Sequence, residues 1–240
     1  MENLNYIGLS QQMALSHQMD VVANNIANMS TPGYKSQDLL FREYVNQAPS
    51  GIDKFSQVQD YGTYRDTHEG TLTKTSNKLD VAIQGDGYIA VQTAQGVRYT
   101  RNGSFSLDST GNIVTQNGDQ VLGSNGNPLA LQGDSHDINI MQDGEISTEK
   151  GGVGTFKIVD FDNPQALVAV GGGLYDAQGA TEIPVAKPQV MEGFVEGSNV
   201  QPITEMNKMI NISRMYQAVQ KMLLTDHDDA RTMIQKLTTA

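Results

Sequence analysis

The chain has 240 residues and a mass of 26.0 kDa, which allows one large or two small domains with a buried core. Hydrophobic residues make up 38% of it, the mean hydropathy is -0.39, and no apolar run approaches the roughly 20 residues of a membrane-spanning helix, which excludes direct membrane insertion. The net charge of -11 without a basic stripe argues against nucleic acid as a partner, and the absence of cysteine excludes disulfides and thiolate chemistry.

Charge and glycine divide the chain into three parts. Residues 1–31 carry no Lys or Arg, residues 205–240 are nearly neutral, and the acidity therefore lies in the middle. Glycine is absent from residues 205–240, and proline is absent before Pro32 and after Pro202. Because both residue types interrupt helices and form turns, the pattern predicts an α+β protein: a helix, a turn-rich middle and a second helix.

The first segment has the spacing of a helix with one narrow apolar seam. The seam follows a 4-3-4-3 spacing through Leu15, Met19, Val22, Ile26 and Met29. The helix should end at Thr31-Pro32-Gly33, since a proline disfavours helical backbone in the residue before it. The opening residues, 1–6, have neither the basic nor the apolar stretch of a cleaved secretory signal.

Residues 32–78 are predicted to be an extended or loop connection, and residues 79–202 a β-rich domain. Short alternating runs of strand length recur from Leu79 onward: 80–84, 88–91, 97–100, 104–107, 113–115, 155–161 and 191–196. Between them stand Asn-Gly and Asp-Gly pairs such as Asn102-Gly103 and Asn117-Gly118, which favour type I′ hairpin turns. We therefore expect an antiparallel all-β domain inserted between the helices, without βαβ units.

The last segment, residues 203–240, is predicted to be a long helix with a second narrow seam. Its spacing of three and four residues is kept through Met209, Ile212, Tyr216, Val219, Leu223, Asp226, Ala230, Met233 and Leu237. With residues 1–31 it is expected to form a coiled-coil-like terminal domain.

Two narrow seams allow two arrangements. They can pack against each other as a helical hairpin within one chain, or they can pack between subunits. A narrow seam leaves no wide apolar face for the β domain, and isolated helices are marginal in water. We therefore expect termini that are largely unfolded in the free chain and become helical between subunits.

Residue patterns for catalysis or cofactor binding are weak. Gly85-Asp86-Gly87 precedes no helix and so lacks the context of a phosphate loop. The four histidines are scattered, which predicts no metal site, and no nucleophile motif is present. No cofactor is expected. A carboxylate pair for glycoside hydrolysis stays open, because 27 acidic residues always provide some pair.

Three blocks resemble bacterial flagellar rod and hook proteins. The first is Ala23-Asn24-Asn25-Ile26-Ala27-Asn28-Met29-Ser30-Thr31-Pro32-Gly33-Tyr34-Lys35. The second joins Leu79-Asp80-Val81-Ala82-Ile83-Gln84-Gly85-Asp86-Gly87-Tyr88 to Tyr99-Thr100-Arg101-Asn102-Gly103-Ser104-Phe105. The third is Glu196-Gly197-Ser198-Asn199-Val200 with Arg214-Met215-Tyr216-Gln217. The short length and Asn199-Val200-Gln201-Pro202 look most like the proximal-rod members of this family.

The resemblance implies a non-enzymatic structural subunit of the flagellar basal-body rod, located in the periplasm and exported uncleaved by the flagellar type III apparatus. It implies that the terminal helices polymerise as an inner tube and transmit torque, with the β domain outside. The implied partners are other copies of the chain and neighbouring rod proteins. The alternatives are a distal-rod or hook-type subunit and, from another class, a carbohydrate-active enzyme acting on the cell wall.

The expected assembly interface comprises the seams and three amides that a packed tube could use to fix helix register. Its residues are Leu15, Met19, Val22, Asn24, Asn25, Ile26, Asn28, Met209, Ile212, Tyr216, Val219, Leu223, Met233 and Leu237.

Overall fold

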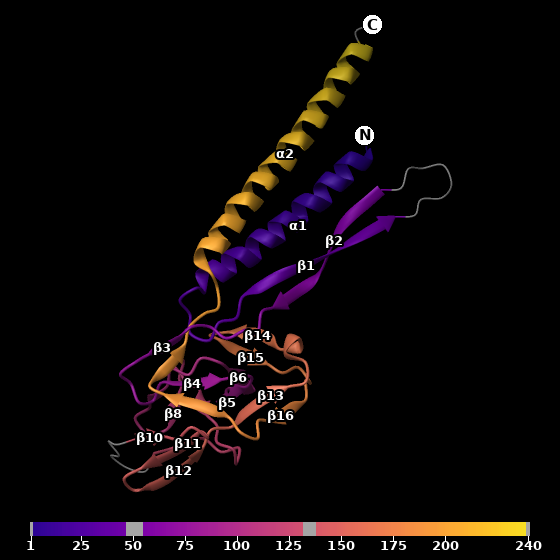
Figure 1. Ribbon diagram of the computed structural model, residues 1–240. Coiled ribbons are helices and arrows are strands. Elements are labelled where there is room, and N and C mark those ends of the chain that lie inside the picture. The colour runs from indigo at the N-terminus through magenta and orange to yellow at the C-terminus, as the bar shows by residue number, and fades with distance from the viewer. Residues whose placement is uncertain (1, 47–54, 132–137, 239–240) are drawn as a thin grey trace. The chain divides into compact units, whose positions relative to one another are not determined.

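The computed structural model describes residues 2–46, 55–131 and 138–238 (Figure 1). A long helix stands at each end of the chain and the part between them is mostly β. The α+β class predicted from the sequence is confirmed.

The helices are α1 (Glu2–Ala27) and α2 (Pro202–Thr238), with one short 3₁₀ helix, η1 (Pro164–Ala166). The first strands are β1 (Gln37–Asn46), β2 (Phe55–Arg65), β3 (Leu72–Lys74), β4 (Val81–Gln84), β5 (Tyr88–Thr93), β6 (Gly96–Thr100), β7 (Ser106–Leu107), β8 (Ile113–Val114) and β9 (Gln120–Val121). The later strands are β10 (Ile138–Ile140), β11 (Glu145–Thr148), β12 (Gly151–Thr155), β13 (Ile158–Phe161), β14 (Val168–Gly171), β15 (Leu174–Asp176), β16 (Glu182–Pro184), β17 (Gln189–Glu192) and β18 (Phe194–Glu196).

The chain divides into two compact units, each made of separate segments. The helical unit comprises Met1–Ala27, Gln37–Arg65 and Gln201–Ala240, and the β unit comprises Asn28–Ser36 and Asp66–Val200. The predicted connection, residues 32–78, is therefore shared between them: its middle carries the β1–β2 hairpin, and its ends belong to the β unit. The sequence pattern missed this hairpin because polar residues interrupt its apolar alternation.

The helical unit contains α1, α2 and the β1–β2 hairpin. The hairpin pairs antiparallel from Gln37 opposite Arg65 to Asn46 opposite Phe55, with a bulge between Leu40 and Phe41. Both of its strands contact α1, and α1 contacts α2 (Figure 1). Pro202 opens α2, where its missing N–H would in any case have no partner within the helix.

The β unit is centred on a nine-stranded sheet. Its main path runs β14-β15-β6-β5-β9-β8-β7, and β13 joins it through β5 and also pairs with β16. Smaller sheets are formed by β10-β11-β12, β17-β4 and β18-β3. The predicted strands from 80–84 to 113–115 correspond to β4 to β8, and the predicted strand 191–196 is divided into β17 and β18 at Gly193, which has φ +73.

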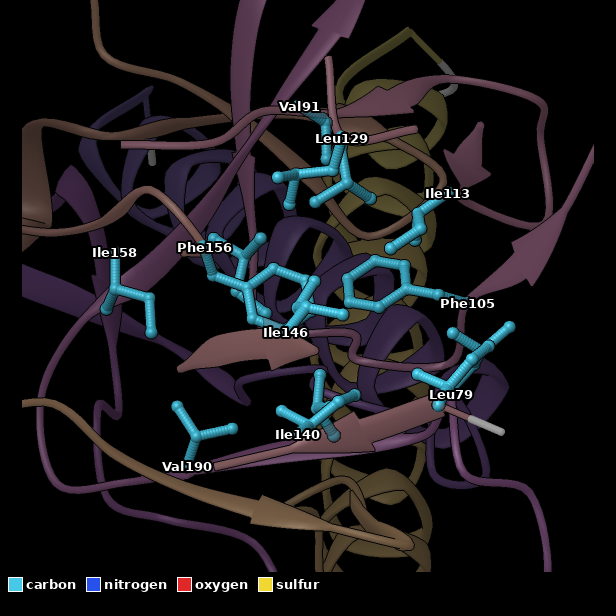
Figure 2. Packing of buried hydrophobic residues seen from close by; sticks show 14 of the residues in the cluster. Leu79, Val91, Phe105, Ile113, Leu129, Ile140, Ile146, Phe156, Ile158 and Val190 are labelled. Carbon is cyan, nitrogen blue, oxygen red and sulfur yellow. The ribbon is translucent and has the colours of Figure 1, made fainter. Parts of the chain in front are cut away.

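Two apolar clusters stabilise the β unit. The larger packs side chains from many short strands around Ile146 and Phe156, with Phe105 stacked on Phe156 at a centroid distance of 6.0 Å (Figure 2). The second gathers aromatic rings, among them Tyr88, which meets Phe161 edge-on at 5.8 Å. Both clusters lie on buried faces of short strands, as the alternating pattern predicts.

Neither Asn-Gly pair forms the predicted type I′ turn, because such a turn needs positive φ at both central residues and Gln178 is the only non-glycine residue with positive φ in the described part of the chain. Gly118, between β8 and β9, has φ +89, which favours glycine. Gly103 lies outside the positive-φ region and is needed for a different reason: a Cβ there would lie 1.7 Å from the Val81 carbonyl oxygen. The second pair is therefore a close approach of two backbones rather than a type I′ turn.

Candidate assembly site

The two predicted seams pack against each other inside the helical unit. Leu15, Val22, Ile212 and Val219 are buried in one cluster. The half-buried members packed against it are Met19, Ile26, Met209, Tyr216 and Leu223. A narrow seam needs one facing helix, and each helix here supplies it for the other.

The helices run antiparallel. A Cβ added to Gly8 would lie 2.6 Å from Leu223 Cδ2, and near the other end the Asn25 amide donates to Glu205 Oε2 at 3.1 Å. The expectation that the seams meet only between subunits is therefore wrong, because they pair within one chain. A spacing of three and four residues predicts that a helix face is covered, but it does not say by which chain.

The three predicted amides have different surroundings. Asn25 is buried: its Nδ2 donates to the Gln37 carbonyl and to Glu205, and its Oδ1 accepts from the Gln37 amide at 3.0 Å. This side chain therefore joins α1, β1 and α2. Asn24 is exposed, and Asn28 follows α1 and accepts a hydrogen bond from the Thr31 hydroxyl.

Charged groups extend the Asn25 contact along the first turn of α2. Lys208 Nζ lies 2.7 Å from Glu205 Oε1 and 3.0 Å from Asp38 Oδ1. Burial alone would lower the pKa of Lys208, but its hydrogen bonds to the two carboxylates outweigh burial and raise that pKa. The start of α2 is thus tied to both α1 and β1.

The end of the α2 seam lies beyond α1. From the pairing of Gly8 with Leu223, the start of α1 lies level with a position about six residues beyond Leu223, so the last turns of α2 extend past it (Figure 1). Leu237 is accordingly 80% exposed. The side chain of Met233 lies outside the described residues.

A second site, which the sequence analysis did not identify, is a buried ion cluster in the β unit. Glu196 Oε1 lies 2.6 Å from Lys35 Nζ, and Glu196 Oε2 lies 3.2 Å from Arg101 Nε. All three side chains are buried. Burial lowers the pKa of Lys35, while the charge and hydrogen bond of Glu196 act against this effect.

The cluster also binds backbone groups from several segments. The Gly70 amide donates to Glu196 Oε1 at 3.1 Å, and Lys35 donates to the His68 carbonyl at 2.7 Å. Arg101 donates to the carbonyls of Gly85 and Gly87, both at 2.8 Å. The Gly85-Asp86-Gly87 loop therefore serves as an acceptor for an arginine. Lys35, Arg101 and Glu196 fall in the three blocks that resemble rod and hook proteins, and that coincidence was the available sequence signal.

The cluster involves the β-unit segments that adjoin the helical unit in the sequence. The chain leaves or enters the β unit after residues 27, 36, 65 and 200, and the segments 28–36, 66–70 and 196–200 all take part in the contacts at this site. Asn199 contributes by accepting from the Ser36 amide at 2.7 Å and donating to the carbonyls of Asp66 and His68. These contacts fix the β-unit ends of the crossing segments.

Within residues 2–46, 55–131 and 138–238, no group of three or more His, Cys, Asp or Glu side chains could hold a metal ion. Among the helices of the described segments, none is both long and apolar enough to cross a bilayer.

The geometry defines a class of protein in which the two chain ends build one helical unit and the middle builds a β unit. Three family models match in the same order. "Flagella basal body rod protein" matches residues 6–35, "Flagellar hook protein FlgE/F/G D1 domain" matches residues 82–148, and "Flagellar basal body rod FlgEFG protein C-terminal" matches residues 191–236.

Individual relatives match over nearly the full length. The flagellar basal-body rod protein FlgF of Caulobacter vibrioides is 36% identical over 99% of this chain and 98% of its own. FlgF of Mesorhizobium japonicum is 31% identical over 96% of this chain and 97% of its own. The rod protein FlgG of Bacillus subtilis is 31% identical over 95% of this chain and 97% of its own. The chain belongs to the flagellar basal-body rod protein family, and the resemblance predicted from the sequence is confirmed.

Proposed function

We propose that this protein is a structural subunit of the bacterial flagellar basal-body rod, that it occupies the proximal part of the rod, and that it has no enzymatic activity. The observation that carries this proposal is the similarity to rod proteins named FlgF and FlgG over both terminal helices and the middle. Its location is accordingly the rod within the periplasm.

The mechanism we propose is packing rather than chemistry. The terminal helices form a coiled-coil-like assembly domain, and the antiparallel β domain lies outside it. The seams from Leu15 to Ile26 and from Met209 to Leu223 hold the helix pair together, and the pair is the rigid element that neighbouring subunits contact. Interdigitated side chains in a close-packed seam resist shear, which suits a shaft that transmits torque.

The proposed partners are other copies of this chain, neighbouring rod proteins and the flagellar type III export apparatus. Export requires an unfolded chain. The cysteine-free sequence and the small core of the helical unit are compatible with threading and later folding.

A complementation experiment tests the proposal. Deleting the gene should abolish swimming, and the full chain should restore swimming and be recovered in isolated basal bodies. A chain ending at residue 200 should restore neither. Swimming of the deletion strain would refute the rod assignment.

A further inference from the structure

The helical unit leaves one face of α1 and one face of α2 open. Successive residues of a helix are rotated by about 100° around its axis. On α1 the seam occupies one side, and a flank with Ala14 and Asn25 lies about 90° around the axis from the seam and faces the β1–β2 hairpin. A third face lies opposite these two. In α2 the corresponding open face lies opposite the seam of Ile212 and Val219.

Each open face carries an apolar triplet with the same spacing, and α2 has further exposed apolar side chains later along the helix, at Met215, Met222 and Leu224. On α1 the triplet is Tyr6, Leu9 and Met13, whose exposed fractions lie between 52 and 67%. On α2 it is Ile203, Met206 and Ile210, whose exposed fractions lie between 47 and 78%. Steps of three and then four residues place each triplet in a line along its helix, as a helix-packing stripe requires.

The two triplets cannot meet within one chain. Because α1 and α2 are antiparallel, Met13 lies level with about Ala218 and Ile210 level with about Asp20. The ends of the triplets are thus separated by about 11 Å along the pair at 1.5 Å per residue. Each line also turns polar where the triplet ends, at Ser16 on α1 and Ser213 on α2.

We propose that the α1 triplet of one copy packs against the α2 triplet of a second copy of this chain. The inference rests on the proposed function and specifies which helix face joins subunits. Two different patches at opposite ends of one helix pair make a head-to-tail contact, which leaves a free patch at each end and extends into a filament rather than closing as a symmetric dimer.

Charge favours the same pairing. α1 contains Glu2 and the exposed Asp20 and no Lys or Arg, whereas the first part of α2 carries the exposed Arg214, and its Lys208 and Glu205 are already paired with each other within the chain. Contact between α1 of one copy and the start of α2 of another therefore brings opposite signs together, while α1 against α1 brings acids together.

Disulfide crosslinking of the full chain tests the pairing, because the chain has no cysteine of its own. Met13→Cys and Ile210→Cys are made in separate chains that carry tags of different size, and the purified chains are mixed and oxidised. The matched control mixes Gln11→Cys with Asn211→Cys, which are exposed neighbours pointing away from the two lines.

The expected product is the mixed 13–210 dimer, at least tenfold more abundant than the control dimer and more abundant than either homodimer. A predominant 13–13 or 210–210 dimer would show a symmetric contact and overturn the proposal. A 13–210 yield no higher than the control, or no dimer at all, would overturn it as well.

A motility assay separates this inference from the proposed function. Ile210→Asp should abolish swimming while the chain keeps its helical circular dichroism, and Asn211→Asp should swim normally. If the deletion strain fails to swim but Ile210→Asp swims like the wild type, the triplet contact is refuted and the rod assignment stands. If the deletion strain swims, the rod assignment itself fails.

Discussion

At the scale of single residues, the carboxylate of Glu196 is held in the interior of the β unit, away from water. It is shared by two buried cations, Lys35 and Arg101. Moving such groups out of water is costly, and the cost is offset only while the pairing is complete. Sequence patterns predict Lys and Glu at the surface, which is why this cluster was missed even though its members lie in recognisable blocks.

Replacing this carboxylate should destabilise the β unit strongly. Glu196→Gln leaves two buried cations without a counter-charge, and the expected loss in the free energy of unfolding is about 3–5 kcal/mol. Lys35→Met keeps the ion pair between Glu196 and Arg101, so the free energy of unfolding should fall by less. Urea denaturation followed by tyrosine fluorescence measures both.

The matched control is Glu182→Gln. Glu182 pairs with Lys157 at 2.7 Å, but both side chains are partly exposed, so the expected loss is below about 1 kcal/mol. Similar losses at Glu196 and Glu182 would contradict a structural role for the buried cluster.

Gly33 shows a second residue-scale constraint. It has φ +69, and a Cβ would lie 2.5 Å from both the carbonyl carbon of Arg101 and the amide nitrogen of Asn102. Gly33→Ala should therefore lower the free energy of unfolding by more than the ~1–2 kcal/mol that left-handed backbone alone costs a non-glycine residue. Gly118→Ala provides the comparison, because Gly118 has φ +89 and an added Cβ would have no atom within 4 Å apart from those of the adjacent residues. Equal losses in urea denaturation would show that the close approach to Arg101 has no energetic effect.

At the scale of elements, periodicity predicted both long helices but not their limits or partners. The first helix was expected to reach Thr31 but ends at Ala27. The residues before Pro32 form a turn instead, in which the Thr31 amide donates to the Asn28 carbonyl and the Thr31 hydroxyl donates to the Asn28 side chain. Spacing identified the buried faces of Ile212 and Val219 correctly. It could not distinguish a partner in the same chain from one in another, since both bury the same residues.

A charge in the seam should separate the two helices. Val219→Asp removes an apolar side chain worth about 1.5–3 kcal/mol and places an unpaired carboxylate in the cluster of Leu15 and Ile212. Far-UV circular dichroism at 222 nm should fall and swimming should stop, while the part of the near-UV signal that comes from the buried β-unit rings of Tyr88, Tyr99 and Tyr175 persists. Gln217→Asp, at an exposed position of the same helix, should have little effect. Normal swimming of the Val219→Asp strain would refute the seam as the joint of the assembly domain.

At the scale of the whole molecule, the three-part division was predictable because glycine and proline are confined to the middle. The interleaving of segments was not. Residues 28–36 belong to the β unit although they follow α1, and residues 37–65 belong to the helical unit. The reason is tertiary: Lys35 is buried against Glu196, and the Gln37 backbone is bonded to Asn25, contacts that no local pattern encodes.

The two units should therefore unfold in two steps. Among the residues that the structure describes, the helical unit has one buried cluster of four apolar side chains, whereas the β unit has two larger clusters. Because stability follows buried apolar area, the purified chain should lose its 222 nm signal at a lower temperature than the near-UV signal of its buried β-unit tyrosines, Tyr88, Tyr99 and Tyr175. Val219→Asp should lower only the first midpoint, and Glu196→Gln only the second. Polymerised protein should show a higher first midpoint, since a partner that binds only folded helices stabilises them. A single transition in which both variants shift both signals together would contradict the independence of the two units.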